Sequence, residues 1–178
     1  MTNNETPTPD LRTDDPVAWI GCLGCYNAGR LVGRWFFAFE IADETATIPT
    51  TCDRCGSDEF DVFDTQNLPG RMTLREFAEQ AGTINELYTD DPDRYVRLLS
   101  LIRDGIAVTL TDADRWDEDN YRGQYESGGD LAEEYATDTG AISGTANWLL
   151  FAIDWQHVWD HTLRYDFHES NGHYWHNT

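Results

Sequence analysis

The segment IGCLGCYNAGRLVGRW, residues 20–35, decides how this chain begins to fold. Apolar and aromatic side chains dominate residues 17–23 and 31–39, and the polar, glycine-containing stretch 26–30 lies between them. Two apolar runs joined by a turn-forming stretch are typical of a β-hairpin. Weak alternation at residues 60–63 predicts a third strand. We therefore expect a small sheet in the N-terminal part of the chain.

Four cysteines accompany this predicted sheet, as two C-x2-C pairs: Cys22 with Cys25, and Cys52 with Cys55. A two-residue spacer lets the chain fold around one ion, and two such pairs supply the four tetrahedral sulfur ligands that Zn²⁺ accepts. We expect Gly24 to supply a bend and Gly56 a positive φ angle. The pattern predicts a structural zinc site with no open position for catalysis. Four reduced, partly buried thiols and a redox or disulfide role are the alternatives.

The next segment, residues 71–104, has a helical pattern. A capping box at 73–76 begins the first helix, because the Thr hydroxyl and the Glu carboxylate each satisfy a free N–H group. We expect Gly82 to end this helix and a second capping box at 83–86 to begin a short one. Pro92 opens a third helix, since proline is tolerated in the first turn.

The last segment, residues 105–178, mixes strand and helix signals, so the predicted fold class is α+β. Strands are expected at 106–110, 121–125, 164–167 and 174–175, the last two joined by an Asn-Gly turn. Helices are expected to start at Asp112, Asp130 and Asp154. The last of these helices has an apolar stripe that we expect to be buried: Trp155, Val158, Trp159 and Thr162.

The composition is strongly acidic. The chain holds 33 Asp and Glu against 12 basic residues, all of them Arg, and its net charge is −21. Polyanions repel such a chain, so we expect no direct binding to nucleic acid or to an acidic membrane. No apolar run is long enough to span a bilayer. Residues 1–16 read as an acidic, disordered tail without a secretion signal, and we expect a cytoplasmic protein.

Half of the charge lies in residues 105–178, where 14 acids and 3 Arg give a net −11. Ten acids crowd into residues 112–138: Asp112, Asp114, Asp117, Glu118, Asp119, Glu126, Asp130, Glu133, Glu134 and Asp138. These acids form either a solvated surface, an adaptation to high salt, or an imitation of phosphates. Duplex DNA carries one charge per ~1.7 Å, so a charge of −21 matches roughly 36 Å, or about ten base pairs.

The order of segments resembles the ArdA antirestriction proteins. Residues 20–35 resemble the family's opening, with its Tyr-Asn-x-Gly-x-Leu-x-Gly-x-Trp pattern, and residues 60–64 look like its next strand. The stretch 121–140 resembles the segment that includes the antirestriction motif. Residues 153–167 are similar to the last helix and the final strand. The resemblance covers roughly residues 17–176.

The resemblance implies an elongated α+β homodimer, built from three small domains. In this chain they are a β-rich zinc-knuckle domain (17–70), a helical middle domain (71–104) and an acidic C-terminal domain with the dimer contact (105–178). The resemblance further implies a non-catalytic DNA mimic that occupies the DNA groove of type I restriction-modification enzymes. Proteins of this family are carried by plasmids, transposons and phages. The second cysteine pair departs from the family pattern, and we interpret it as a zinc knuckle that replaces a helix at 42–57. The stretch 141–151 also departs from the pattern.

Two other functions are compatible with the sequence. One is a zinc-stabilised adaptor protein whose acidity reflects a saline cytoplasm. The other is a metal-dependent enzyme that uses histidines from the C-terminal part, namely His157, His161, His168, His173 and His176. The expected arrangement for a helical zinc hydrolase is missing, because Gln156 and Val158 flank His157 where a Glu would be needed.

Overall fold

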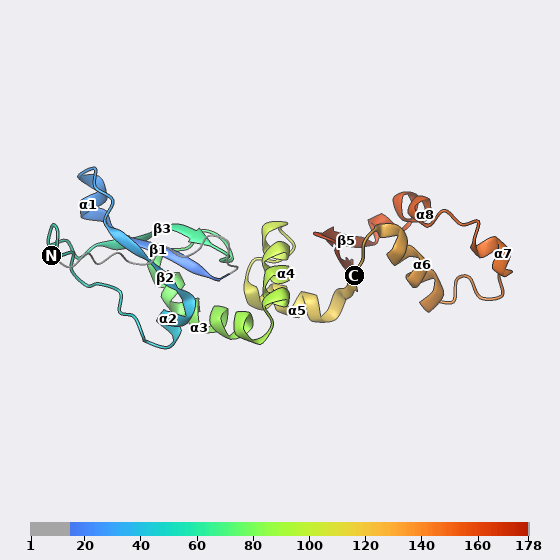
Figure 1. The fold of residues 1–178 in the computed structure, drawn as a ribbon, viewed down its shortest axis with the longest axis horizontal. Helices are drawn as coiled ribbons and strands as arrows, with labels where there is room; N and C mark the ends of the chain where they lie inside the picture. The colour runs from blue at the N-terminus through green and yellow to red at the C-terminus, as the bar shows by residue number, and fades with distance from the viewer. Residues whose placement is uncertain (1–14, 178) are drawn as a thin grey trace. The chain divides into compact units, whose positions relative to one another are not determined.

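The computed structural model describes residues 15–177, which form two compact units that divide between Leu110 and Thr111 (Figure 1). The described residues contain eight α-helices and two small antiparallel sheets, so the predicted α+β class is confirmed. The predicted tail at 1–16 lies outside the described residues except for its last two. The division into three domains stays a prediction.

The first unit is built on a three-stranded antiparallel sheet. Strand β1 (Val17–Cys22) lies between β2 (Gly33–Phe37) and β3 (Phe60–Gln66), and pairs with both of them. The predicted hairpin and third strand are therefore confirmed. The hairpin connection is longer than a tight turn, because it contains the short helix α1 (Leu23–Asn27).

Three helices follow the strands of the first unit: α2 (Ala38–Ala42), α3 (Leu74–Asp90) and α4 (Pro92–Arg103). The capping box is confirmed, since the Glu76 amide donates to Thr73 Oγ1 at 3.3 Å and the Thr73 amide to Glu76 Oε2 at 2.7 Å. The predicted start of α4 at Pro92 is also confirmed.

Three predictions for this unit are wrong. Gly82 does not end a helix and residues 83–86 do not begin a new one, because α3 runs through both, with Ala81 and Ile84 buried on the same face. A glycine costs a helix about 1 kcal/mol relative to alanine, and this buried face outweighs that cost. Residues 106–110 form no strand, because the amide of Ile106 donates to the carbonyl of Leu101 at 2.9 Å and wraps the chain around the end of α4.

The second unit places helices beside a second antiparallel sheet with the order β4-β6-β5. Its strands are β4 (Tyr121–Gln124), β5 (Phe167–Ser170) and β6 (His173–His176). Its helices are α5 (Leu110–Asn120), which begins at the unit boundary, α6 (Gly128–Asp138), α7 (Asn147–Leu150) and α8 (Trp155–His161). The Asn-Gly turn is confirmed, with positive φ angles of 53° at Asn171 and 78° at Gly172.

Three local predictions for the second unit need correction. Helix α6 begins at Gly128 and is capped by the Ser127 hydroxyl, so Asp130 lies inside the first turn. The strand predicted at 164–167 starts only at Phe167, after a 3₁₀ turn at Leu163–Tyr165. Asp154 caps α8 as predicted, but its apolar stripe is half-buried, and Thr162 is exposed.

The core of the second unit consists mainly of aromatic side chains. Leu131, Phe167 and Tyr174 form its buried cluster, and Trp159 packs against it from α8. Helix α6 approaches α8 closely at Gly128, where an added Cβ would overlap the indole of Trp159.

We expect Gly128→Ala to destabilise the protein by about 1–3 kcal/mol, because the new methyl group must displace the Trp159 ring. Gly82→Ala is the matched control. An added Cβ there meets nothing within 4 Å, so this change should stabilise α3 by about 0.5–1 kcal/mol. Urea unfolding measures both. A Gly128→Ala protein as stable as the parent chain would contradict this packing.

Candidate functional site

The two cysteine pairs come together at one end of the first sheet. Cys22 ends β1, Cys25 lies in α1, and Cys52 and Cys55 lie on the loop between α2 and β3. The sulfur of Cys22 is 3.5 Å from that of Cys55, and the sulfur of Cys25 is 3.7 Å from that of Cys52. All four sulfurs lie within 4.8 Å of one another. Four sulfurs bound to one tetrahedral ion at ~2.3 Å would lie about 3.8 Å apart, so this thiol cluster has the dimensions of a metal site.

The first cysteine pair bends at its own helix. Helix α1 starts at Leu23, directly after the strand, and the Cys25 amide donates to Cys22 Sγ at 3.4 Å. The bend therefore comes from this change from strand to helix and not from Gly24 alone. Gly24 is needed for a different reason, since a Cβ there would lie 2.8 Å from the Cβ of Ser57 in the second knuckle.

The second cysteine pair forms a tight turn around Cys52. Gly56 has the predicted positive φ angle, at 71°, and its amide donates to the Cys52 carbonyl at 2.7 Å. A hydrogen bond from the Arg54 backbone lowers the pKa of Cys52 to about 7, whereas burial raises the pKa of Cys25 to about 12. Cys55 is the exposed member, so an ion can enter on its side.

The histidines form no comparable group. Across residues 15–177, the thiol cluster is the only set of three or more His, Cys, Asp or Glu side chains whose ligand atoms converge for a metal ion. His157 and His161 stack with ring centroids 4.0 Å apart on the surface of α8. His173 Nδ1 lies 2.8 Å from the Tyr121 hydroxyl, and His168 packs on Trp175.

All ten acids predicted to bind a partner lie in the second unit, on α5, on α6 and between β4 and α6. Eight of them are exposed, and we refer to these eight collectively as the acidic surface: Asp112, Glu118, Asp119, Glu126, Asp130, Glu133, Glu134 and Asp138. Asp114 is half-buried. Among residues 15–177, Glu133, Glu134 and Asp138 form no ion pair with a basic side chain of the chain itself, so their negative charges are not neutralised within it.

Asp117 has a different environment from the other nine acids. Only 3% of its surface is exposed, and its carboxylate accepts a 2.8 Å hydrogen bond from Nε1 of the fully buried Trp175. This contact joins α5 to β6. Asp117 therefore belongs to the core of the unit and is not a candidate for contact with a partner.

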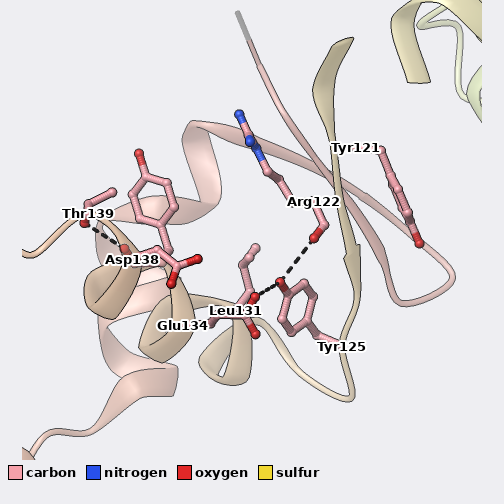
Figure 2. Close-up of a pocket in the computed structure, with 8 residues that line it drawn as sticks. Tyr121, Arg122, Tyr125, Leu131, Glu134, Asp138 and Thr139 are labelled. Atoms are coloured by element: carbon pink, nitrogen blue, oxygen red, sulfur yellow. Dashed lines mark hydrogen bonds between the residues drawn. The ribbon is translucent and has the colours of Figure 1, made fainter. Parts of the chain in front are cut away.

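A cavity of about 450 Å³ adjoins Glu134 and Asp138 of the acidic surface, and no sequence motif predicts it (Figure 2). It is lined from α6 and from the β4 side by Tyr121, Arg122, Tyr125, Leu131, Glu134, Tyr135, Asp138 and Thr139. The Tyr125 hydroxyl donates to Glu134 Oε1 at 2.9 Å. Burial, and then this bond to Glu134, raise the pKa of Tyr125 to about 12.

The sequence predicts only one part of this cavity, the pair of carboxylates on α6. Glu134 and Asp138 are four residues apart, which places both on one face of a helix. That Tyr125 faces them depends on how β4 packs beside α6, and spacing along the chain does not reveal such packing.

These features describe a small, acidic α+β protein with a four-thiol cluster and a carboxylate-rich second unit. A sequence model of the antirestriction protein (ArdA) family matches residues 18–175. The match covers most of the chain, so the chain belongs to the ArdA family of antirestriction proteins, and the predicted family is confirmed. A comparison with curated proteins finds no match. Among the helices that the structure describes, none combines the length and apolar character needed to cross a membrane.

We expect Asp117→Leu to destabilise the second unit by about 1–3 kcal/mol, because it leaves the buried Trp175 N–H without this acceptor. Asp119→Leu is the matched control, since it removes the same charge from an exposed position of the same helix. Thermal unfolding followed by tryptophan fluorescence compares the two variants. Equal melting temperatures would show that the Asp117 carboxylate has no structural role.

Proposed function

We propose that this chain is a non-catalytic DNA mimic that inhibits type I restriction-modification enzymes by occupying their DNA-binding groove. Membership of the antirestriction family is the observation that carries the proposal. The exposed carboxylates of the acidic surface would take the places of DNA phosphates, and Arg and Lys side chains of the enzyme would pair with them. Such a protein acts in the cytoplasm and is carried by a mobile genetic element or phage that protects its own DNA.

The distribution of charge supports this mechanism. Residues 111–178 hold 14 acids and 3 Arg, and eight of the acids form the exposed acidic surface. An enzyme groove that binds DNA carries cationic side chains spaced to meet successive phosphates. The complex between such a groove and the acidic surface should therefore weaken steeply as the salt concentration increases. The main alternative is an adaptor protein whose acidity reflects a saline cytoplasm. In that case the position of each acid is unimportant and only the total charge matters.

A matched pair of variants separates these functions. The first replaces four acids of the acidic surface, as Asp112→Asn, Asp119→Asn, Glu126→Gln and Glu133→Gln. The second removes the same charge from exposed positions of α3 and α4, as Glu79→Gln, Glu86→Gln, Asp90→Asn and Asp93→Asn. At ~0.2–1 kcal/mol per pair, the first variant should lose about 1–3 kcal/mol of binding to a type I enzyme, and its salt dependence should become shallower.

Binding of both variants to several purified type I enzymes is measured over a range of salt concentrations. The second variant should stay within about threefold of the parent chain, because its charges face no enzyme cation. Equal losses in the two variants would favour total charge over mimicry. Absence of any complex between the folded parent chain and these enzymes at low ionic strength would refute the proposed function.

We further propose that the thiol cluster binds one structural Zn²⁺. Its four cysteine sulfurs lie at separations that fit a tetrahedral S₄ site, and such a site favours zinc. All four ligands would be protein thiolates, so the ion would have no open position for a substrate. Its contribution would be to hold the loop that carries Cys52 and Cys55 against β1.

Protein purified without chelators should contain one zinc per chain by elemental analysis. Cys25→Ser should lower the zinc content and the melting temperature, because it removes one ligand from the core of the site. Ser57→Ala lies beside the cluster and supplies no sulfur, so it should retain its zinc. Metal-free wild-type protein with four readily alkylated thiols would refute this site.

We also propose that the protein is a homodimer that associates through the second unit. Around α7, Trp148, Leu149 and Phe151 expose 71%, 43% and 91% of their surface. Three large apolar side chains on one short segment of an otherwise acidic unit are typical of an interaction surface. Dimerisation would double the number of carboxylates offered to one groove.

A further inference from the structure

The cavity between β4 and α6 combines carboxylates with aromatic rings. Glu134 and Asp138 supply two carboxylates from one face of α6, and the rings of Tyr125 and Tyr135 supply aromatic walls. Figure 2 shows Glu134 and Asp138 approaching from the helix and Tyr125 from the opposite side. Its volume of about 450 Å³ lies within the ~300–1,000 Å³ typical of small-molecule sites.

The walls of this cavity are held in place by the core behind them. The Tyr135 ring packs edge-on against Phe167, with centroids 5.4 Å apart, and the Tyr125 ring packs edge-on against Tyr174 at 5.8 Å. The Tyr125 hydroxyl lies 2.9 Å from Glu134 Oε1 and 3.2 Å from the Arg122 carbonyl oxygen, and its single proton is shared between these two acceptors. A ligand would therefore meet preformed walls and would lose little free energy in ordering them.

We propose that this cavity is a receptor for one arginine side chain of the partner enzyme. A guanidinium group is planar, so it can stack on a tyrosine ring while it donates hydrogen bonds to a carboxylate. Lysine presents a compact, strongly hydrated charge without a planar face, so it cannot stack flat on a ring while it pairs with a carboxylate. The inference rests on the proposed function, because that function supplies a partner with a cationic groove.

Arg122 is the one cation among the residues that line the cavity, so replacing it tests whether charge contributes to arginine binding. Its guanidinium repels an incoming arginine, whereas Glu134 and Asp138 attract one. Replacing Arg122 by Gln should therefore strengthen arginine binding. Arg115→Gln is the matched control, since Arg115 is exposed on α5, makes no contribution to the cavity and carries the same charge.

The test titrates the full chain with N-acetyl-arginine-N-methylamide and follows the tyrosine ring resonances by NMR. The lysine analogue and the uncharged citrulline analogue are titrated in parallel. We expect saturable shifts at Tyr125 and Tyr135, and binding at least about fivefold tighter for arginine than for either analogue. No saturable shift, or equal binding of the lysine analogue, would overturn the proposal.

Variants then locate the site. Glu134→Gln should weaken binding of the arginine probe at least about fivefold, because it removes one of the two negative charges that line the cavity. Glu133→Gln, one position earlier and turned about 100° away on α6, should change it less than about twofold. Arg122→Gln should bind the probe more tightly than Arg115→Gln. Equal effects within either pair would assign the binding to diffuse charge and would overturn the proposal.

The same variants are compared in their affinity for a type I enzyme. Glu134→Gln should lose more affinity than Glu133→Gln. If both lose equally while the parent chain still binds, the arginine receptor is wrong and competition for the groove stands. If the parent chain takes up the arginine probe but binds no type I enzyme, the proposed function is wrong, and with it the assignment of the arginine to that enzyme.

Discussion

The convergence of four cysteine sulfurs at the end of β1 is the constraint on which the first unit depends. Strand β1 is the centre of its sheet, and Cys22 is its last residue. The loop between α2 and β3 crosses residues 43–59 without a helix or a strand, and Cys52 is its buried anchor. A small sheet has little apolar surface to bury, so a cross-link through one ion would replace the core that such a loop lacks.

The second unit is also small, and aromatic side chains supply most of its buried apolar surface. Its 68 residues carry a net −11, and their mutual repulsion opposes a compact fold. Trp175 and Tyr174 are buried in β6, and Trp159 covers Gly128 from α8. One carboxylate, Asp117, is used inside this core as the acceptor for Trp175. The remaining acids can stay on the surface, where the proposed mechanism needs them.

Local sequence signals predicted much of this fold, and their failures have a common cause. The hairpin, the capping box at Thr73 and the Asn171-Gly172 turn are local features, and the structure contains all three. Gly82 was expected to end a helix, but the buried face of α3 continues through it. Residues 106–110 have strand-like side chains, but the amides of Ile106 and Ala107 donate to the Leu101 carbonyl at the end of α4. In both cases a contact made after folding overrides a local preference.

The sequence by itself determined the family, the acidity and the two cysteine pairs, because composition and short motifs are written along the chain. Only the tertiary structure decided which of these residues meet. It brought four sulfurs that are up to 33 positions apart within 4.8 Å, placed Asp117 in the core and placed Tyr125 opposite Glu134. The physical reason is that burial and pairing depend on packing between distant segments, and an acid looks the same in a sequence whether it faces water or a tryptophan N–H.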